Sequence, residues 1–179
     1  MDRHTFDPGP IAKVECHRDN DRWTLVLVRE LRHPPEKVWA ALTEADQLNQ
    51  WSPFAADRDL DRTGEATLTM IDGEVSQAVP ATVLLAEPPN VLEYTWGDDL
   101  LRWELESSTT GTQLTLRHTL DNRDHLPKVA AGWHICLVVA EQLLTGDPIG
   151  VIRGRDAMEF GWQDLHDAYA GSLGAAGTT

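Results

Sequence analysis

The longest apolar helical pattern in the chain lies between Leu126 and Leu144, in the segment LPKVAAGWHICLVVAEQLL. Its apolar residues recur every three or four positions, at Leu126, Val129, Ala130, Trp133, Leu137, Ala140 and Leu144. This spacing places them on one face of a helix, and Gly146 just beyond is a typical helix stop. We therefore predict one long amphipathic helix, whose apolar face must be covered by another part of the chain.

The preceding sequence predicts a sheet as that partner. Apolar and polar residues alternate in segments separated by turn residues, at 11–17, 23–31, 66–71, 76–86, 91–96, 100–107 and 112–119. Asp72-Gly73 predicts a type I′ hairpin turn, and Pro80 predicts a bulge or an edge position. Because the links between these strands are short, consecutive strands must be antiparallel.

Shorter helices are predicted on either side of the later strands. A proline in His33-Pro34-Pro35-Glu36 suits the first turn of a short helix, one face of which is marked by Val38, Trp39 and Leu42. Thr43 is a candidate N-cap for a second helix over 44–49. Phe160, Trp162, Leu165, Tyr169 and Leu173 indicate a last helix near the C-terminus. We expect residues 171–179 to form a flexible tail.

These elements predict an α+β fold formed by a single domain over residues 1–170. A curved antiparallel sheet wraps around the long C-terminal helix, and two short helices follow the N-terminal strands. A sheet that grips a helix in this way leaves a cavity between them, and that cavity is where we expect function to lie.

Composition limits the classes of partner. The 179 residues include 29 acidic and 15 basic side chains, which gives a formal charge of −14. This balance disfavours nucleic acid and anionic membrane surfaces, because both attract Lys and Arg. The two cysteines, Cys16 and Cys136, show no disulfide or metal spacing, and no signal peptide or membrane span is evident. We therefore expect a cytoplasmic protein with reduced thiols.

The sequence contains no common catalytic or cofactor signature, so we predict no cofactor and no metal. Asp57, Asp59 and Asp61 resemble the opening of a calcium loop, but Arg62 stands where that loop requires Gly, which favours a solvated acidic edge. His134 and Cys136 lie two apart on one helix and face different directions, so a structural role is favoured for both.

His118 shares a strand face with Leu114 and Leu116, so we expect it to point toward the concave side of the sheet. A hydrogen-bonded core histidine is the commoner interpretation of such a position, and a ligand contact is the alternative. By the same alternation, Glu104 should face outward. Seven tryptophans occur in the chain, and they either fill the core or line an apolar pocket.

Two stretches resemble one known family. Arg29-Glu-Leu31, followed by His33-Pro-Pro-Glu-Lys-Val-Trp39 and later by Trp51, resembles the opening motif of SRPBCC proteins, in the branch named after the activator of heat-shock protein 90 ATPase. Leu114 to His118 and the segment Gly132-Trp-His-Ile-Cys-Leu137 are similar to the same branch. The resemblance covers roughly residues 9 to 170.

The resemblance implies a helix-grip, START-like fold with a hydrophobic cavity between the sheet and the C-terminal helix. Relatives include lipid carriers, hormone receptors, polyketide cyclases and a chaperone-binding domain, so it implies little about activity. Family functional residues carry over only as cavity-wall positions, which strand parity places at Trp51, Phe54, Trp96, Trp103, His118, Trp133 and Leu137.

Three functions remain open at this point. The leading hypothesis is a protein that binds a small hydrophobic molecule in the cavity, with His118 orienting one polar group of the ligand. The second is a cyclase-, aromatase- or hydrolase-type enzyme in which His118 or Glu104 acts as general acid or base. The third is a chaperone-linked or stress-response interaction module. A homodimer is also open, since Trp162 and Tyr169 could pack on their own domain or on a second copy.

Overall fold

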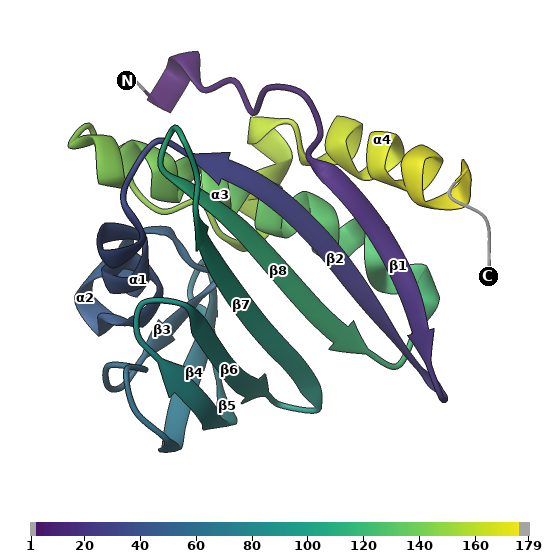
Figure 1. Cartoon of the computed structure of the whole chain (residues 1–179). Helices are drawn as coiled ribbons and strands as arrows, with labels where there is room; N and C mark the ends of the chain where they lie inside the picture. Colours follow the sequence, from purple (N-terminus) through teal and green to yellow (C-terminus); the bar gives the residue numbers. More distant parts are fainter. Residues whose placement is uncertain (1–2, 176–179) are drawn as a thin grey trace.

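The computed structural model describes residues 3–175 and contains one eight-stranded antiparallel sheet (Figure 1). The strands lie in the spatial order β1-β2-β8-β7-β6-β5-β4-β3. Their bounds are β1 (Lys13–Asp19), β2 (Arg22–Leu31), β3 (Phe54–Ala56), β4 (Gly64–Asp72), β5 (Val75–Glu87), β6 (Val91–Trp96), β7 (Asp99–Ser107) and β8 (Thr112–Leu120). The α+β helix-grip prediction is confirmed, and only the three-residue β3 was not predicted.

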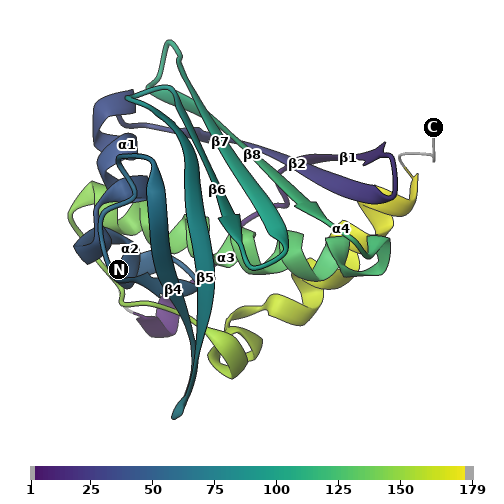
Figure 2. The same ribbon diagram turned by 90° about the horizontal axis from the view of Figure 1, so that it is seen from below.

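The helices are α1 (Pro35–Thr43), α2 (Ala45–Trp51), α3 (Leu126–Thr145) and α4 (Trp162–Ala175), with short 3-10 helices η1 (Arg3–Thr5), η2 (Arg123–His125) and η3 (Gly154–Phe160). Figures 1 and 2 show α3 crossing one face of the curved sheet, while α4 lies beside β1. As predicted, α3 ends at Gly146, which takes up the left-handed conformation at φ 89°.

The sheet presents alternate residues to α3. Along β8 every second residue is buried, so Leu114, Leu116 and His118 face the helix while the residues between them are partly exposed. Trp103 on β7 faces the same side, and Glu104 faces the other, where it forms an ion pair with Arg117. The predicted parity of these two strands is therefore correct.

Two local predictions were wrong in detail. The β4–β5 hairpin has Gly73 and Glu74 as its two loop residues. Gly73 has φ 62°, and the only non-glycine residue between 3 and 175 with a positive φ is Asn20, so the turn is of type II′ and not type I′. The N-cap of α2 is Glu44 and not Thr43.

The predicted N-cap Thr43 bonds within its own helix instead. Its hydroxyl donates to the Trp39 carbonyl at 2.8 Å, one turn earlier in α1. The first amide of α2, Ala45, donates to the Asp59 carboxylate at 2.8 Å. A side chain from a distant loop therefore supplies the cap, which local sequence spacing does not reveal.

The C-terminal region is more ordered than expected. Helix α4 continues to Ala175, so residues 171–175 of the predicted tail are helical, and Leu173 is buried. Residues 176–179, the rest of that tail, lie outside the described residues. Within residues 3–175, no helix has the length and apolar character needed to cross a membrane.

Candidate functional site

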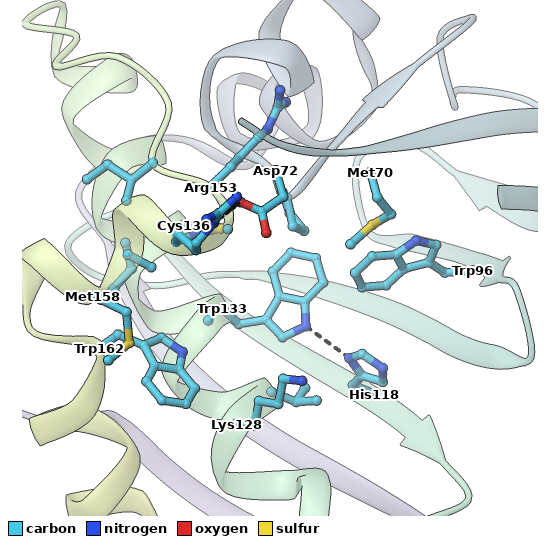
Figure 3. A pocket seen from close by; sticks show the side chains of 18 residues that line it. Met70, Asp72, Trp96, His118, Lys128, Trp133, Cys136, Arg153, Met158 and Trp162 are labelled. Atoms are coloured by element: carbon cyan, nitrogen blue, oxygen red, sulfur yellow. Dashed lines mark hydrogen bonds and ion pairs between the residues drawn. The ribbon is translucent and has the colours of Figure 1, made fainter. Parts of the chain in front are cut away.

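A pocket of about 470 Å³ lies between the sheet, α3 and the segment that joins α3 to α4 (Figure 3). Its walls are mainly apolar and come from distant parts of the chain: Met70 on β4, Trp96 on β6, Val129 and Trp133 on α3, Ile152 and Met158 after α3, and Trp162 on α4. Gly132 also lines it, and a Cβ atom at that position would meet nothing within 4 Å. The absent side chain of Gly132 therefore leaves space that the pocket occupies.

The structure brings six of the seven predicted wall residues together in one aromatic cluster, namely Trp51, Phe54, Trp96, Trp103, His118 and Trp133. Trp133 is its centre, with ring centroids 5.3 Å from Trp103, 6.0 Å from Trp96 and 6.5 Å from Trp51. The contacts with Trp103 and Trp96 are edge-on, an arrangement that stabilises the rings beyond their burial, and the contact with Trp51 is tilted.

Only part of this cluster reaches the pocket surface. Trp96, His118 and Trp133 line the pocket, whereas Trp51, Phe54, Trp103 and Leu137 are not among its lining residues and are almost completely buried. The indole of Trp51 donates to the Ala41 carbonyl at 2.8 Å, which anchors it to α1. Trp51, Phe54 and Trp103 pack behind the lining rings of Trp133 and Trp96, and Leu137 is buried in the core.

His118 is hydrogen-bonded on both sides. The Trp133 indole donates to Nδ1 of His118 at 2.9 Å, and Nε2 lies 2.7 Å from the Asp99 carboxylate. Because an indole N–H can only donate, Nδ1 must accept, and the ring proton therefore sits on Nε2 and is donated to Asp99. His118 is the hydrogen-bonded histidine that the sequence suggested, and neither nitrogen is left to hold a polar group of a ligand.

Charged groups gather at the rim of the pocket. Lys128, Arg153 and Arg155 are the cationic lining residues, against the single carboxylate of Asp72. The Arg153 guanidinium is turned away, toward the carbonyls of Ser52 and Phe54 at 2.8 and 3.0 Å, and burial lowers its pKa. Figure 3 shows Lys128 on the side of Trp162 and His118.

The segment over the pocket is attached to the β4–β5 hairpin. The Asp72 carboxylate accepts the Arg155 amide at 3.1 Å. Gly154, at φ 55°, lies so close that a Cβ atom there would fall 2.3 Å from the same carboxylate. Only glycine fits this approach, which fixes η3 as one wall of the pocket.

His134 and Cys136 have structural roles, as predicted. His134 Nε2 lies 2.6 Å from the Pro8 carbonyl and Nδ1 lies 2.7 Å from the Tyr169 hydroxyl, and desolvation lowers the His134 pKa. Cys136 borders the pocket, but burial raises the pKa of its thiol to about 12. A thiol that stays protonated at neutral pH is a poor nucleophile and a poor metal ligand.

The acidic stretch around Asp57 organises the backbone. The carboxylate of Asp57 accepts the Thr67 amide at 2.8 Å and that of Asp59 caps α2, while Arg58 donates to carbonyls of the same loop. Across residues 3–175, no three His, Cys, Asp or Glu side chains lie together in a way that could hold a metal ion.

Sequence reasoning missed several lining residues. Met158 was not singled out in the sequence, and Trp162 belongs to the C-terminal apolar pattern, but nothing in that pattern shows that this part of the chain turns back over the pocket. Lys128 carried a local signal, since it lies one helical turn before Gly132 on the same face. The placement of Asp72 and Arg155 depends on contacts more than 80 residues apart and has no local signal.

Comparisons with solved structures agree with this architecture. CalU16 from Micromonospora echinospora is 20% identical with a TM-score of 0.69, covering 93% of this chain and 96% of that chain. A conserved protein of unknown function, EF2215 from Enterococcus faecalis, is 19% identical with a TM-score of 0.67 and covers 93% of both chains. An AHSA1-like protein from Aeromonas hydrophila is 18% identical with a TM-score of 0.59, covering 69% of this chain and 92% of that one. At these identities the likeness shows the fold alone.

No curated protein matches the chain by sequence. A protein family does match, over residues 32–144, which run from just after β2 almost to the end of α3. Its description is activator of Hsp90 ATPase homolog 1-like protein. This match covers more than half of the 179 residues and includes the Trp133–His118 side of the pocket. The chain therefore belongs to the family of activator of Hsp90 ATPase homolog 1-like proteins, within the SRPBCC superfamily.

Proposed function

We propose that this protein binds a small, largely apolar molecule in the pocket between the sheet and α3. The observation that carries the proposal is a space of about 470 Å³ with tryptophan and methionine walls, beside a core in which the neighbouring side chains are closely packed. Pockets that bind small molecules have this size and this apolar character. The fold is that of ligand-binding SRPBCC proteins, which supports the same proposal.

The pocket walls combine rigid aromatic side chains with flexible methionine side chains. Trp133 and His118 are held by their mutual hydrogen bond and by the rings behind them. Met70 lies beside Trp96 and Met158 beside Trp162 (Figure 3), and an unbranched thioether adapts to ligands of different shape. This arrangement favours binding through shape and apolar area, with few directional polar contacts.

The proposal is tested by titrating the protein with N-phenyl-1-naphthylamine, an uncharged apolar probe that fluoresces when it leaves water. The decisive variant is Gly132→Phe, because the new ring would project into the open space at that position. The matched control is Gly171→Phe, which places the same ring at an exposed glycine of α4 where a Cβ atom also meets nothing within 4 Å.

We expect the wild-type protein and the Gly171→Phe variant to bind the probe alike, and Gly132→Phe to lose at least about tenfold in affinity, since the ring occupies the pocket. Circular dichroism checks that both variants remain folded. The proposal is wrong if the wild-type protein does not bind the probe, or if a folded Gly132→Phe variant binds it as well as the control does.

Binding is preferred to catalysis because of His118. A general acid or base needs a ring nitrogen within reach of the substrate, and both nitrogens of His118 are engaged by Trp133 and Asp99. Glu104, the other candidate, points to the opposite face of the sheet and pairs with Arg117. The enzyme alternative would therefore require the Trp133–His118 bond to break on substrate binding.

Cytoplasmic location, a homodimer and a chaperone partner remain predictions. Native mass spectrometry of the purified protein tests the homodimer together with the ligand. A reproducible added mass supports an occupied pocket, and the number of chains in the main species decides between a monomer and a dimer.

A further inference from the structure

We infer that the molecule bound in this pocket is a carboxylic acid with an apolar body, and that Lys128 holds its carboxylate at the rim. This inference rests on the proposed function and adds the chemical class of the ligand. It follows from the distribution of polar groups around the pocket, which differs sharply between the inner wall and the rim.

The inner wall leaves almost no polar capacity for a ligand. The indole N–H of Trp133 is donated to His118, and both ring nitrogens of His118 already form hydrogen bonds. Arg153 directs its Nε and one terminal nitrogen to backbone carbonyls near the end of α2. The Cys136 thiol is buried and only weakly polar. The indole N–H groups of Trp96 and Trp162 form no hydrogen bond within residues 3–175 and are the neutral donors left in this lining. Elsewhere an inward-facing polar group of a ligand would lose its water without gaining a partner, which favours a ligand whose inner part is largely apolar.

The rim carries the opposite charge from the rest of the molecule. The chain has a formal charge of −14, yet three of the four charged residues that line the pocket are basic. Asp72 lies 3.8 Å from Arg155, so these two charges largely offset each other. The Arg153 guanidinium is turned away from the pocket. Lys128 is the cation left to face a ligand.

Lys128 is an exposed side chain at the mouth of the pocket, so its ammonium is free to meet a ligand. Its ammonium forms no hydrogen bond or ion pair with any residue between 3 and 175. It is the third residue of α3, where the helix dipole disfavours a positive charge, and the first turn of α3 contains no acidic residue to offset it. A cation in this place weakens the helix, which a ligand carboxylate would reverse.

The position of Lys128 also suits a contact between its ammonium and a ligand carboxylate. It precedes Gly132 by one turn on the same face of α3, so its side chain extends beside the space that the glycine leaves open. Figure 3 shows it next to the Trp133–His118 pair, with Trp162 on its other side. A carboxylate at the rim can therefore meet the ammonium while its apolar body lies against the indoles.

The experiment is isothermal titration calorimetry at pH 7.5 and low salt with two probes of the same shape, 2-naphthoate and 2-naphthamide. The variants are Lys128→Gln, which removes the charge, and Lys128→Glu, which reverses it. The control is Lys13→Gln, which removes one exposed charge from β1, away from the pocket.

We expect the wild-type protein to bind 2-naphthoate about two- to fivefold more tightly than 2-naphthamide, the effect of roughly one charge contact at a protein surface. Lys128→Gln should remove this preference and leave 2-naphthamide binding unchanged, and Lys128→Glu should reverse it. Lys13→Gln should keep the preference. Added salt should weaken 2-naphthoate binding only, because ions screen the contact.

A stability measurement adds a second test. If Lys128 were a structural residue, Lys128→Gln would lower the melting temperature, whereas the helix-dipole reasoning predicts a small rise. The inference is overturned if both probes bind with equal affinity or if Lys128→Gln leaves the preference intact. If neither probe binds while N-phenyl-1-naphthylamine does, the inference is overturned and the proposed function stands; if none of the three binds, the proposed function itself is overturned.

Discussion

Replacing Tyr169 by Phe removes one hydroxyl that joins three parts of the molecule. Tyr169 lies on α4 and is completely buried. Its oxygen accepts the Ala12 amide at 2.8 Å and donates to Nδ1 of His134 at 2.7 Å, and His134 in turn donates to the Pro8 carbonyl. This chain of bonds fastens the N-terminal segment and α4 to α3.

The expected loss can be worked out from these partners. His134 is 1% exposed, so its Nδ1 would be left buried without a donor, and the half-buried Ala12 amide would lose its acceptor. A buried group left unpaired costs about 1–3 kcal/mol. We therefore expect Tyr169→Phe to lower the free energy of unfolding by about 2–4 kcal/mol, a fall in melting temperature of roughly 5–15 °C for a chain of this size.

The assay is urea denaturation followed by tryptophan fluorescence at pH 7.5, with Tyr94→Phe as the control. Tyr94 is also almost fully buried, but its hydroxyl has a single long bond, from the Trp103 indole at 3.3 Å. Its loss should cost about 1 kcal/mol. If Tyr169→Phe is no more destabilising than Tyr94→Phe, the Tyr169 hydroxyl does not connect these segments in the way described.

Three further predictions concern stability. Burial lowers the pKa of His134 below its ordinary value of 6.5, so the unfolded chain takes up a proton more readily than the folded one. The contribution of neutral His134 to the free energy of unfolding is therefore present above about pH 6.5 and is lost as the pH falls. The melting temperature should decline between pH 7.5 and 5.5, and it should decline less steeply in a folded His134→Gln variant, which lacks this group. Gly111→Ala should cost roughly 2–4 kcal/mol in urea denaturation, because the new Cβ would lie 2.2 Å from the Leu31 carbonyl oxygen at φ 152°. Gly9→Ala, at φ 70° with open space around it, should cost only about 1 kcal/mol, and equal losses at the two sites would contradict this reasoning. Gly132→Ala should stabilise α3 by about 0.5–1 kcal/mol in the same assay, since the site is helical and open, and a loss would show that the space is not free.

The elements of the fold were largely predictable, because each rests on a local pattern. The three- and four-residue spacing around Trp133 defined α3, and period-two alternation defined all the long strands. The strand β3 was missed because three residues are too few to show a period. The cap of α2 was misplaced because its carboxylate, Asp59, comes from a loop that follows the helix.

The candidate site was predictable on one side only. Trp96, His118 and Trp133 were expected on the wall from strand parity and helical spacing, and they line the pocket. Trp51 and Trp103 were expected there too, but whether a ring ends at the surface of a pocket or one layer behind it depends on how neighbouring rings pack. Periodicity gives the face of an element and not the depth of a side chain.

The sequence by itself determined which residues form strands and helices, which faces are apolar, and that a sheet must close around the helix of Trp133. Only the tertiary structure decided that both nitrogens of His118 are hydrogen-bonded and that the segment of Met158 and Trp162 closes the pocket. It also decided that Lys128 lies at the rim without a partner among residues 3–175. The physical reason is the separation along the chain over which each effect acts. Periodicity and turn chemistry act between near neighbours in the chain, whereas a pocket and its charges arise where residues distant in sequence meet.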